Sequence, residues 1–353
     1  GIPDRDIDDL APYWDLFPSL RGHLFAASRP GYSDLRVTAG DIKTAILAHP
    51  EFVAYTETVN DVFGRWQAGN LARLKGIEMG DRPKPLIDNL SEGLLHAFAG
   101  VKLIDKYDVY QHLMGYWTDA MQDDVYMIVA DGWAGANKLR LLEARSGEKP
   151  DLKIGRLKYK ADLIPPALII ARYFAAEQQA IEALEAEKEA AAQQKEEMEE
   201  EHGGEEGLLE EAKSDAGNVT KTALNARIKE IWHDPEFADE LEVLNAYKAL
   251  MDRESDLSSE IKEAQKVLDR KVVANYDDLS EDEVKALVVD DKWLATLSAD
   301  VQTELDRISR RLTGRIKELA DRYAAPLPEL VEETNALGDR VDAHLEEMGF
   351  AWK

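Results

Sequence analysis

Apolar residues recur at helical spacing along most of the chain, and the segments differ in how often this pattern is interrupted. Residues 1–163 mix short helical patterns with many Gly, Pro and aromatic positions, a texture typical of a compact domain. Within it, the spacing of apolar residues predicts a helix over 90–98, with Ser91 as a possible cap, and a second helix over 108–120. The N-terminal part is therefore expected to be mostly helical.

Two short runs in the same part favour β-structure. Residues 125–130 (VYMIVA) combine β-branched and aromatic side chains and end at Asp131-Gly132, which predicts a buried strand or a tight apolar loop. Residues 152–159 contain Gly155 and predict a short hairpin at a sheet edge.

The chain changes character after Pro165-Pro166. Residues 167–201 contain no Gly or Pro and are dominated by Ala, Glu, Gln and Lys, which predicts one long uninterrupted helix. Its apolar positions are spaced 7, 3, 7 and 7 residues apart, as in a coiled-coil seam: Phe174, Ile181, Leu184, Ala191 and Met198. A polar, acidic connector lies near 202–218, and a short helix is expected over 219–232.

A second heptad helix follows. Its seam positions are Val243, Tyr247, Leu250, Leu257, Ile261, Ala264 and Leu268. Two such helices joined by a short connector most simply fold back into an antiparallel coiled-coil hairpin with arms about 50 Å long. The seam also offers a surface for a partner, through Phe174, Ile181, Leu184, Leu250, Leu257, Ile261 and Leu268. The alternative is an intramolecular bundle without a partner, and periodicity alone leaves both open.

The last part of the chain is expected to be helical again. Ser280 followed by Glu283 forms a capping-box signature. A long helix is then predicted from Val301, Leu305, Ile308, Leu312, Leu319 and Tyr323, and a final one from Leu330, Thr334, Leu337, Val341 and Met348. The tail 349–353 (GFAWK) is apolar enough to dock on a surface.

These patterns predict a mainly α fold in three parts. Residues 1–163 form a compact helical domain with a little β-structure, 164–275 form the coiled-coil arm, and 276–353 form a C-terminal helical region. Composition agrees, since 44% of the 353 residues are hydrophobic and 32% are charged.

Composition also excludes several classes of protein. The chain has no Cys, which rules out disulfide scaffolds, thiolate metal sites and cysteine nucleophiles and favours a reducing, cytoplasmic location. No run of 18 apolar residues occurs, so no membrane span is expected. The chain begins at Gly1 without an initiator Met, and we expect it to be a piece of a longer protein.

Charge is unevenly spread around a formal net charge of −27. Between residues 182 and 215 there are 14 acidic residues and three lysines. Over 138–160 the sign reverses, and we call these eight cations the basic island: Lys138, Arg140, Arg145, Lys149, Lys153, Arg156, Lys158 and Lys160. The island is a candidate for contacts with DNA phosphates, and the alternative is a solvated hairpin beside an acidic domain.

Common catalytic signatures are absent from the sequence. It contains no G-x-G-x-x-G, no P-loop, no G-x-S-x-G and no H-E-x-x-H. The densest group of candidate side chains is His112, Asp119, Asp123 and Asp124, which would serve acid–base or metal chemistry if they converged. The alternative is that the carboxylates cap helix ends and the surrounding aromatics form core.

Four strings carry a family resemblance: 2–8 (IPDRDID), 107–124 (YDVYQHLMGYWTDAMQDD), 160–166 (KADLIPP) and 287–294 (LVVDDKWL). In these the chain resembles the C-terminal half of the modification subunit of type I restriction-modification systems, over essentially its whole length. The resemblance implies an adenine-N6 DNA methyltransferase that uses S-adenosylmethionine. It also implies assembly of two modification subunits with a DNA-reading specificity subunit, joined by a restriction subunit.

The chain departs from the family pattern at the decisive point. The catalytic N-P-P-F or N-P-P-Y motif and the F-x-G-x-G cofactor loop are both absent. A base-flipping methyltransferase needs that pocket, so no catalytic, cofactor-binding or metal-binding residue is carried over, and this chain is expected to be inactive alone.

Three hypotheses follow. The first is an assembly module that docks on the specificity subunit, as the family's C-terminal helices do by the resemblance, with DNA contacts from the basic island. The second is an enzyme built on His112, Asp119, Asp123 and Asp124. The third is a free-standing coiled-coil adaptor.

Overall fold

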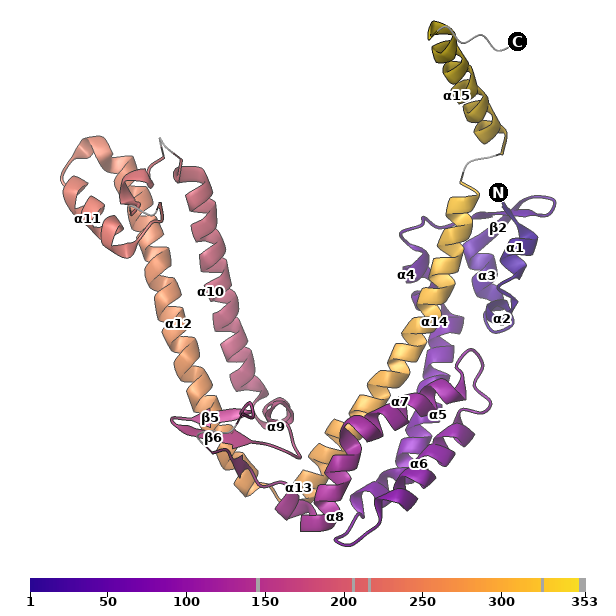
Figure 1. The fold of residues 1–353 in the computed structure, drawn as a ribbon, viewed down its shortest axis with the longest axis horizontal. Coiled ribbons are helices and arrows are strands. Elements are labelled where there is room, and N and C mark those ends of the chain that lie inside the picture. The colour runs from indigo at the N-terminus through magenta and orange to yellow at the C-terminus, as the bar shows by residue number, and fades with distance from the viewer. Residues whose placement is uncertain (144–146, 205–206, 215–216, 325–326, 349–353) are drawn as a thin grey trace. The chain divides into compact units, whose positions relative to one another are not determined.

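The computed structural model describes residues 1–143, 147–204, 207–214, 217–324 and 327–348. Helices dominate these residues, and the strands form two small antiparallel sheets of three strands each, so the mainly α fold is confirmed (Figure 1). The chain divides into two compact units. Unit 1 comprises Gly1–Val129 with Val289–Lys353, and unit 2 comprises Ala130–Val288. The divisions predicted at residues 163 and 275 both fall within unit 2.

Unit 1 is built from helices around α14, with one small sheet near the N-terminus. Its strands occur in the spatial order β1-β3-β2. Its elements are β1 (Ile2–Pro3), α1 (Asp4–Asp8), α2 (Ala11–Trp14), α3 (Pro18–Leu24), β2 (Phe25–Arg29), β3 (Tyr32–Leu35), α4 (Ile42–Ala48), α5 (Pro50–Lys75), α6 (Pro83–Ala97), α7 (Lys106–Tyr116), the π-helix η1 (Trp117–Met121), α14 (Ala295–Arg322) and α15 (Leu327–Glu347). Two elements cross the division between the units: α8 (Gln122–Ala136) and the π-helix η4 (Ala286–Leu294).

The core of unit 1 follows the apolar face of α14. Val301, Leu305, Ile308, Leu312 and Leu319 are all buried, as their helical spacing predicts. This face packs on α4, α5 and α7. Burial of a continuous apolar stripe from one helix against three others supplies the main hydrophobic stabilisation of the unit.

Two predictions in the N-terminal part were wrong. Residues 125–130 lie in α8 rather than in a strand, because a short apolar run looks the same in a buried helix and in a buried strand. Ser91 lies inside α6 instead of capping a helix, since Pro83 at the first turn already starts that helix eight residues earlier. The helix predicted over 108–120 runs as α7 and then widens to the i→i+5 hydrogen-bond register of a π-helix in η1.

Unit 2 consists of a long helical hairpin with a sheet at one end and a small cluster at the other. Its elements are β4 (Arg140–Leu141), β5 (Leu152–Ile154), β6 (Leu157–Lys160), α9 (Pro166–Tyr173), α10 (Ala175–His202), η2 (Glu210–Ala212), α11 (Lys221–Ile231), η3 (Pro235–Phe237), α12 (Ala238–Asp278) and α13 (Glu281–Lys285). α13 begins with the predicted capping box of Ser280 and Glu283, which is confirmed.

α10 and α12 lie side by side and antiparallel, as the heptads predict (Figure 1). Salt bridges cross the pair from Glu177 to Lys271 (2.8 Å) and from Lys195 to Glu254 (2.6 Å). α12 has 41 residues and is therefore about 60 Å long. The predicted uninterrupted helix over 167–201 is broken at Phe174, whose φ of −130° ends α9 before α10 begins.

The far end of the hairpin is closed by its own hydrophobic cluster. Leu209, Leu224, Ile231, Leu244 and Tyr247 are buried together there, where η2 and α11 pack on the start of α12. The short helix predicted over 219–232 is α11. The acidic connector includes 205–206 and 215–216, which lie outside the described residues, as do Arg145 and the tail 349–353.

Within the described ranges, no helix is both long enough and apolar enough to cross a membrane.

Candidate functional site

The basic island folds into the three-stranded sheet of unit 2. β6 is the central strand, and β4 and β5 pair with it in antiparallel register, with Arg140 opposite Lys160 and Lys153 opposite Lys158. A two-residue turn joins β5 to β6, and its first residue, Gly155, has a φ of +60°. Such a conformation favours glycine, and it suits the tight turns that match the twist of a hairpin. The hairpin predicted over 152–159 is confirmed.

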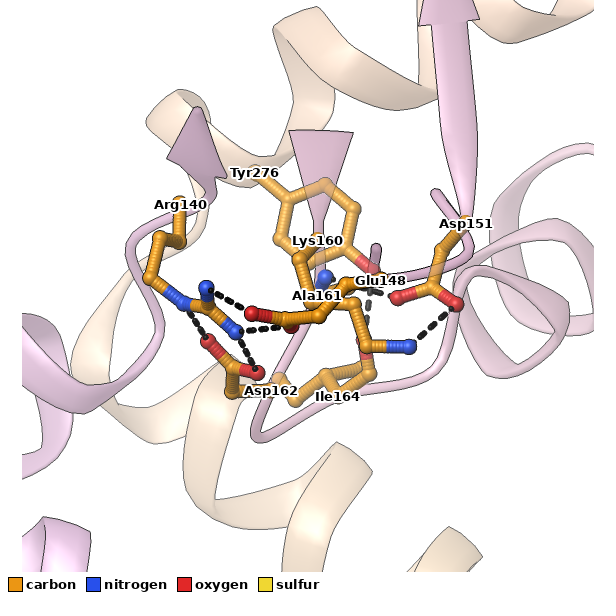
Figure 2. A network of polar contacts seen from close by, with 8 residues as sticks. All are labelled: Arg140, Glu148, Asp151, Lys160, Ala161, Asp162, Ile164 and Tyr276. Atoms are coloured by element: carbon orange, nitrogen blue, oxygen red, sulfur yellow. Dashed lines mark hydrogen bonds and ion pairs between the residues drawn. The ribbon is translucent and has the colours of Figure 1, made fainter. Parts of the chain in front are cut away.

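Arg140 is held by two carboxylates (Figure 2). Its Nε and Nη2 donate to the two oxygens of Asp162 at 2.8 and 3.0 Å, and its Nη1 and Nη2 donate to Glu148 at 3.1 and 2.8 Å. These bonds raise the pKa of Arg140 and lower the pKa values of both carboxyls. A guanidinium bonded on two sides in this way has little left to offer a phosphate.

Lys160 is also used inside the unit. Its Nζ donates to Asp151 at 2.9 Å, and the other oxygen of Asp151 accepts from the backbone N–H of Ala161 at 2.9 Å (Figure 2). Nearby, the Tyr276 hydroxyl of α12 donates to the Ile164 carbonyl, and burial raises the pKa of this tyrosine. The hydrogen bonds of Arg140 and Lys160 therefore stabilise the sheet and the segment that follows β6.

The other cations of the island remain available to an outside ligand. Lys138, Lys149, Lys153 and Arg156 are exposed, and Lys158 is half-buried. None of these five forms an ion pair with another residue in the described ranges. The predicted set of eight thus divides into two structural residues, five unpaired ones, and Arg145, which lies outside the described residues.

The predicted partner seam is buried within the chain at three of its seven positions. Ile181, Leu257 and Leu268 are buried in the helical hairpin, with at most 3% of each side chain exposed. The other four seam residues are half-buried: Phe174, Leu184, Leu250 and Ile261. The geometry matches the intramolecular alternative at the buried positions, because α10 and α12 cover each other there.

The four residues of the enzyme hypothesis have separate surroundings. His112 on α7 pairs through Nε2 with Glu304 of α14 at 2.9 Å. Asp119 and Asp123 are exposed, whereas Asp124 is buried and contacts other partners. In the described part of the chain, no three His, Asp or Glu side chains are grouped so that they could hold a metal ion. The arrangement gives no convergent catalytic site at these residues.

Asp124 instead joins α8 to η4. Its Oδ1 accepts from the Lys292 ammonium at 2.9 Å and its Oδ2 accepts from the indole N–H of Trp293 at 2.8 Å. Burial raises the pKa of Asp124, and the bond and charge of Lys292 partly oppose that rise. The contact brings two of the quoted strings together, 107–124 and 287–294. η4 is further tied to α5 by the Lys75–Asp290 salt bridge of 2.6 Å.

One group of exposed cations was missed at the level of sequence. Lys262, Lys266 and Arg270 lie on α12 beside the β5–β6 hairpin. Their spacing of four residues was a usable signal, because such residues share a helix face. The same segment carries the heptad seam, whose apolar positions are the stronger pattern.

A scan against protein-family models gave no match for this chain, and searches of curated proteins and of solved structures gave none either.

Proposed function

We propose that this chain is the C-terminal assembly region of a type I restriction-modification methyltransferase subunit, working in the cytoplasm. It docks on the specificity subunit, in a complex with a second modification subunit, the restriction subunit and DNA. S-adenosylmethionine and the methyl transfer belong to the preceding part of the subunit. No residue here is assigned to either, because the sequence lacks both corresponding motifs.

The observation that carries the proposal is the exposed apolar face of α15. Leu337 and Val341 lie on one side of this helix and Met348 follows its last residue, and their exposed fractions are 51%, 57% and 72%. An amphipathic helix that shows its apolar stripe to solvent is the usual form in which a helix is offered to a groove or to partner helices. Docking on a helical partner would bury this stripe.

A second observation supports the family assignment. The strings 107–124 and 287–294 are far apart in the chain, yet they meet through Asp124, Lys292 and Trp293 in unit 1. Two of the four strings that carry the resemblance thus contact each other in the folded unit.

The test is co-purification of the chain with the specificity subunit of its own gene cluster. Wild type is expected to co-elute in size-exclusion chromatography, and the double variant Leu337→Ser/Val341→Ser is expected to lose about 10-fold or more in affinity, because two apolar anchors are removed. The matched control is Asp339→Ser/Ala343→Ser on the opposite face of the same helix. Absence of co-elution by wild type, or equal loss in the control, would refute the proposal.

The coding sequence upstream of Gly1 separates this proposal from the free-standing adaptor. A methyltransferase subunit requires an N-P-P-F or N-P-P-Y motif in the same reading frame. An adaptor requires none. Translation of the preceding segment of the gene is therefore a direct test.

A further inference from the structure

A groove of about 720 Å³ lies within unit 2, between the tip of the β5–β6 hairpin and α12. The hairpin contributes Lys153, Ile154 and Gly155 to its lining, and α12 contributes one face around Ile261. The groove is open to solvent along its charged side, since Lys153 and the α12 cations are exposed.

Cations line this groove from both elements. Lys262, Lys266 and Arg270 follow one another at every fourth residue of α12, so they share a face and extend along about 12 Å of helix. Lys153 reaches the groove from the hairpin. Four positive side chains thus meet in a protein whose formal net charge is −27.

Neighbouring acids neutralise the set only in part. Lys153 and Lys262 form no ion pair with any residue in the described ranges. Lys266 and Arg270 share one exposed carboxylate, Glu263, at 3.2 and 3.6 Å. Exposed pairs of this kind are weak and give way readily to a multivalent anion.

Two acids also belong to the lining. Asp269 accepts a hydrogen bond from Gln265 at 2.8 Å, and Glu185 extends from α10. With four cations and two acids in the lining, the groove keeps an excess of positive charge.

The strand register places a second lysine beside Lys153. Lys153 and Lys158 are directly opposite each other on β5 and β6. Like charges in that position destabilise a strand pair. An anion bound at Lys153 lowers this cost, although Lys158 itself is not among the residues that line the groove.

We propose that this groove binds the phosphate backbone of duplex DNA, with Lys153, Lys262, Lys266 and Arg270 as the contacting residues. The inference rests on the proposed function, which places the chain in a DNA-modifying complex. It moves the expected DNA contacts away from Arg140 and Lys160, which are paired inside the sheet, and onto α12.

The spacing and chemistry of the lining residues suit contacts with the phosphate backbone of DNA and not with the edges of its bases. Each DNA strand carries a phosphate about every 3.4 Å of axis, so about 12 Å of helix face spans several phosphates. No lining residue is aromatic, and lysines act as point charges. Contacts of this type position DNA without reading its sequence, which leaves the reading of the target to the specificity subunit.

The test compares two triple variants of the full chain by fluorescence anisotropy with a labelled duplex. Lys153→Gln/Lys262→Gln/Lys266→Gln is expected to weaken binding about 10-fold or more at about 50 mM salt, and to reduce the salt slope by about one per lysine removed. The matched control, Lys43→Gln/Lys229→Gln/Lys317→Gln, removes equal charge from exposed, unpaired lysines elsewhere. It is expected to keep the affinity and slope of wild type within about 2-fold.

Three results would overturn the inference. The first is that wild type does not bind duplex DNA at low salt, and the second is that the groove variant and the control bind DNA with equal affinity. The third is that wild type binds poly-glutamate more tightly than duplex DNA, which would assign the groove to an acidic protein. Circular dichroism of both variants checks the fold, and Lys262→Glu alone provides a second, single-site variant.

Co-elution with the specificity subunit separates this inference from the proposed function. The groove variant leaves α15 unchanged, so it is expected to co-elute like wild type. Co-elution with no DNA binding refutes the groove alone, whereas DNA binding without co-elution refutes the proposed function and leaves the groove contacts standing.

Discussion

At the scale of single residues, the role of each cation in the basic island depends on which acid the fold brings to it. Arg140 meets Glu148 and Asp162, eight and 22 residues further along the chain. Lys153 lies on the opposite edge strand of the same sheet, β5, and meets none. Identical charge in one stretch of sequence therefore serves two purposes, organisation of the sheet and availability to a ligand.

The Arg140 network predicts a pH dependence with a definite sign. Its bonds hold the pKa of Asp162 below the ordinary value of about 3.9. The stabilisation that Asp162 gains is complete above that value and is lost as the pH falls through the lower pKa of the folded state. The difference in unfolding free energy between wild type and Arg140→Gln is therefore expected to be largest above about pH 5 and to shrink towards pH 2. Urea denaturation across this range measures it.

Arg156→Gln is the matched control, because Arg156 lies in the β5–β6 turn of the same sheet, is exposed and has no partner in the described ranges. Its stability difference from wild type is expected to stay near zero and flat with pH. A pH-independent loss in Arg140→Gln would contradict the proposed role of Asp162, and an NMR titration of its carboxyl carbon would show the pKa directly.

These residue-level partners mark the limit of what sequence can predict. The eight basic positions were visible in the sequence, but the Arg140–Asp162 bond was not, because it depends on β4 pairing with β6 and on the path of the chain after Lys160. The spacing of Lys262, Lys266 and Arg270 was visible too. Only the position of the hairpin beside α12 gives that spacing a role.

At the scale of elements, the joint between α8 and η4 depends on one buried carboxylate. Asp124→Ala removes the partner of the Lys292 ammonium, whose side chain is only 14% exposed, and of the Trp293 indole. Loss of one member of a buried pair typically costs about 3–5 kcal/mol. Chemical denaturation of Asp124→Ala should show a loss of this size in unit 1.

The neighbouring exposed residue provides the comparison. Asp123→Ala removes the same side chain one position earlier and is expected to change stability by about 0.5 kcal/mol or less. Similar losses in the two variants would mean that the Asp124 contacts contribute nothing specific to the joint.

Elements with strong periodicity were predictable, and short apolar runs were not. The heptads at Ile181, Leu257 and Leu268 predicted the antiparallel helix pair and these buried positions, but not the break at Phe174. Residues 125–130 were predicted wrongly because a six-residue run of apolar side chains has no polar positions by which a strand can be distinguished from a helix; in α8 Tyr126 and Ala130 are in fact exposed. The two π-helices have no compositional signature, since a change in hydrogen-bond register leaves residue types unaltered.

At the scale of the whole molecule, the charge of −27 acts against both folding and DNA binding. A negative protein repels a polyanion at long range, so attraction has to come from a local site such as the groove beside α12. The 14 acids between residues 182 and 215 concentrate much of the repulsion along α10 and the connector after it. Salt therefore has opposite effects on the two properties, since it screens the self-repulsion and also weakens phosphate contacts.

The opposite effects of salt on folding stability and on DNA affinity give a prediction for the wild-type chain. Raising NaCl from about 10 to 150 mM shortens the Debye length from about 30 to 8 Å. The melting temperature should rise by a few degrees, because repulsion among the excess acids is screened while the exposed salt bridges contribute little. DNA affinity should fall over the same range.

Calorimetry and fluorescence anisotropy on the same samples measure the melting temperature and the DNA affinity, with sucrose at equal osmolality as the control for non-ionic effects. A falling melting temperature would mean that the surface ion pairs outweigh the net charge, and an affinity that does not change with salt would exclude phosphate contacts as the basis of binding.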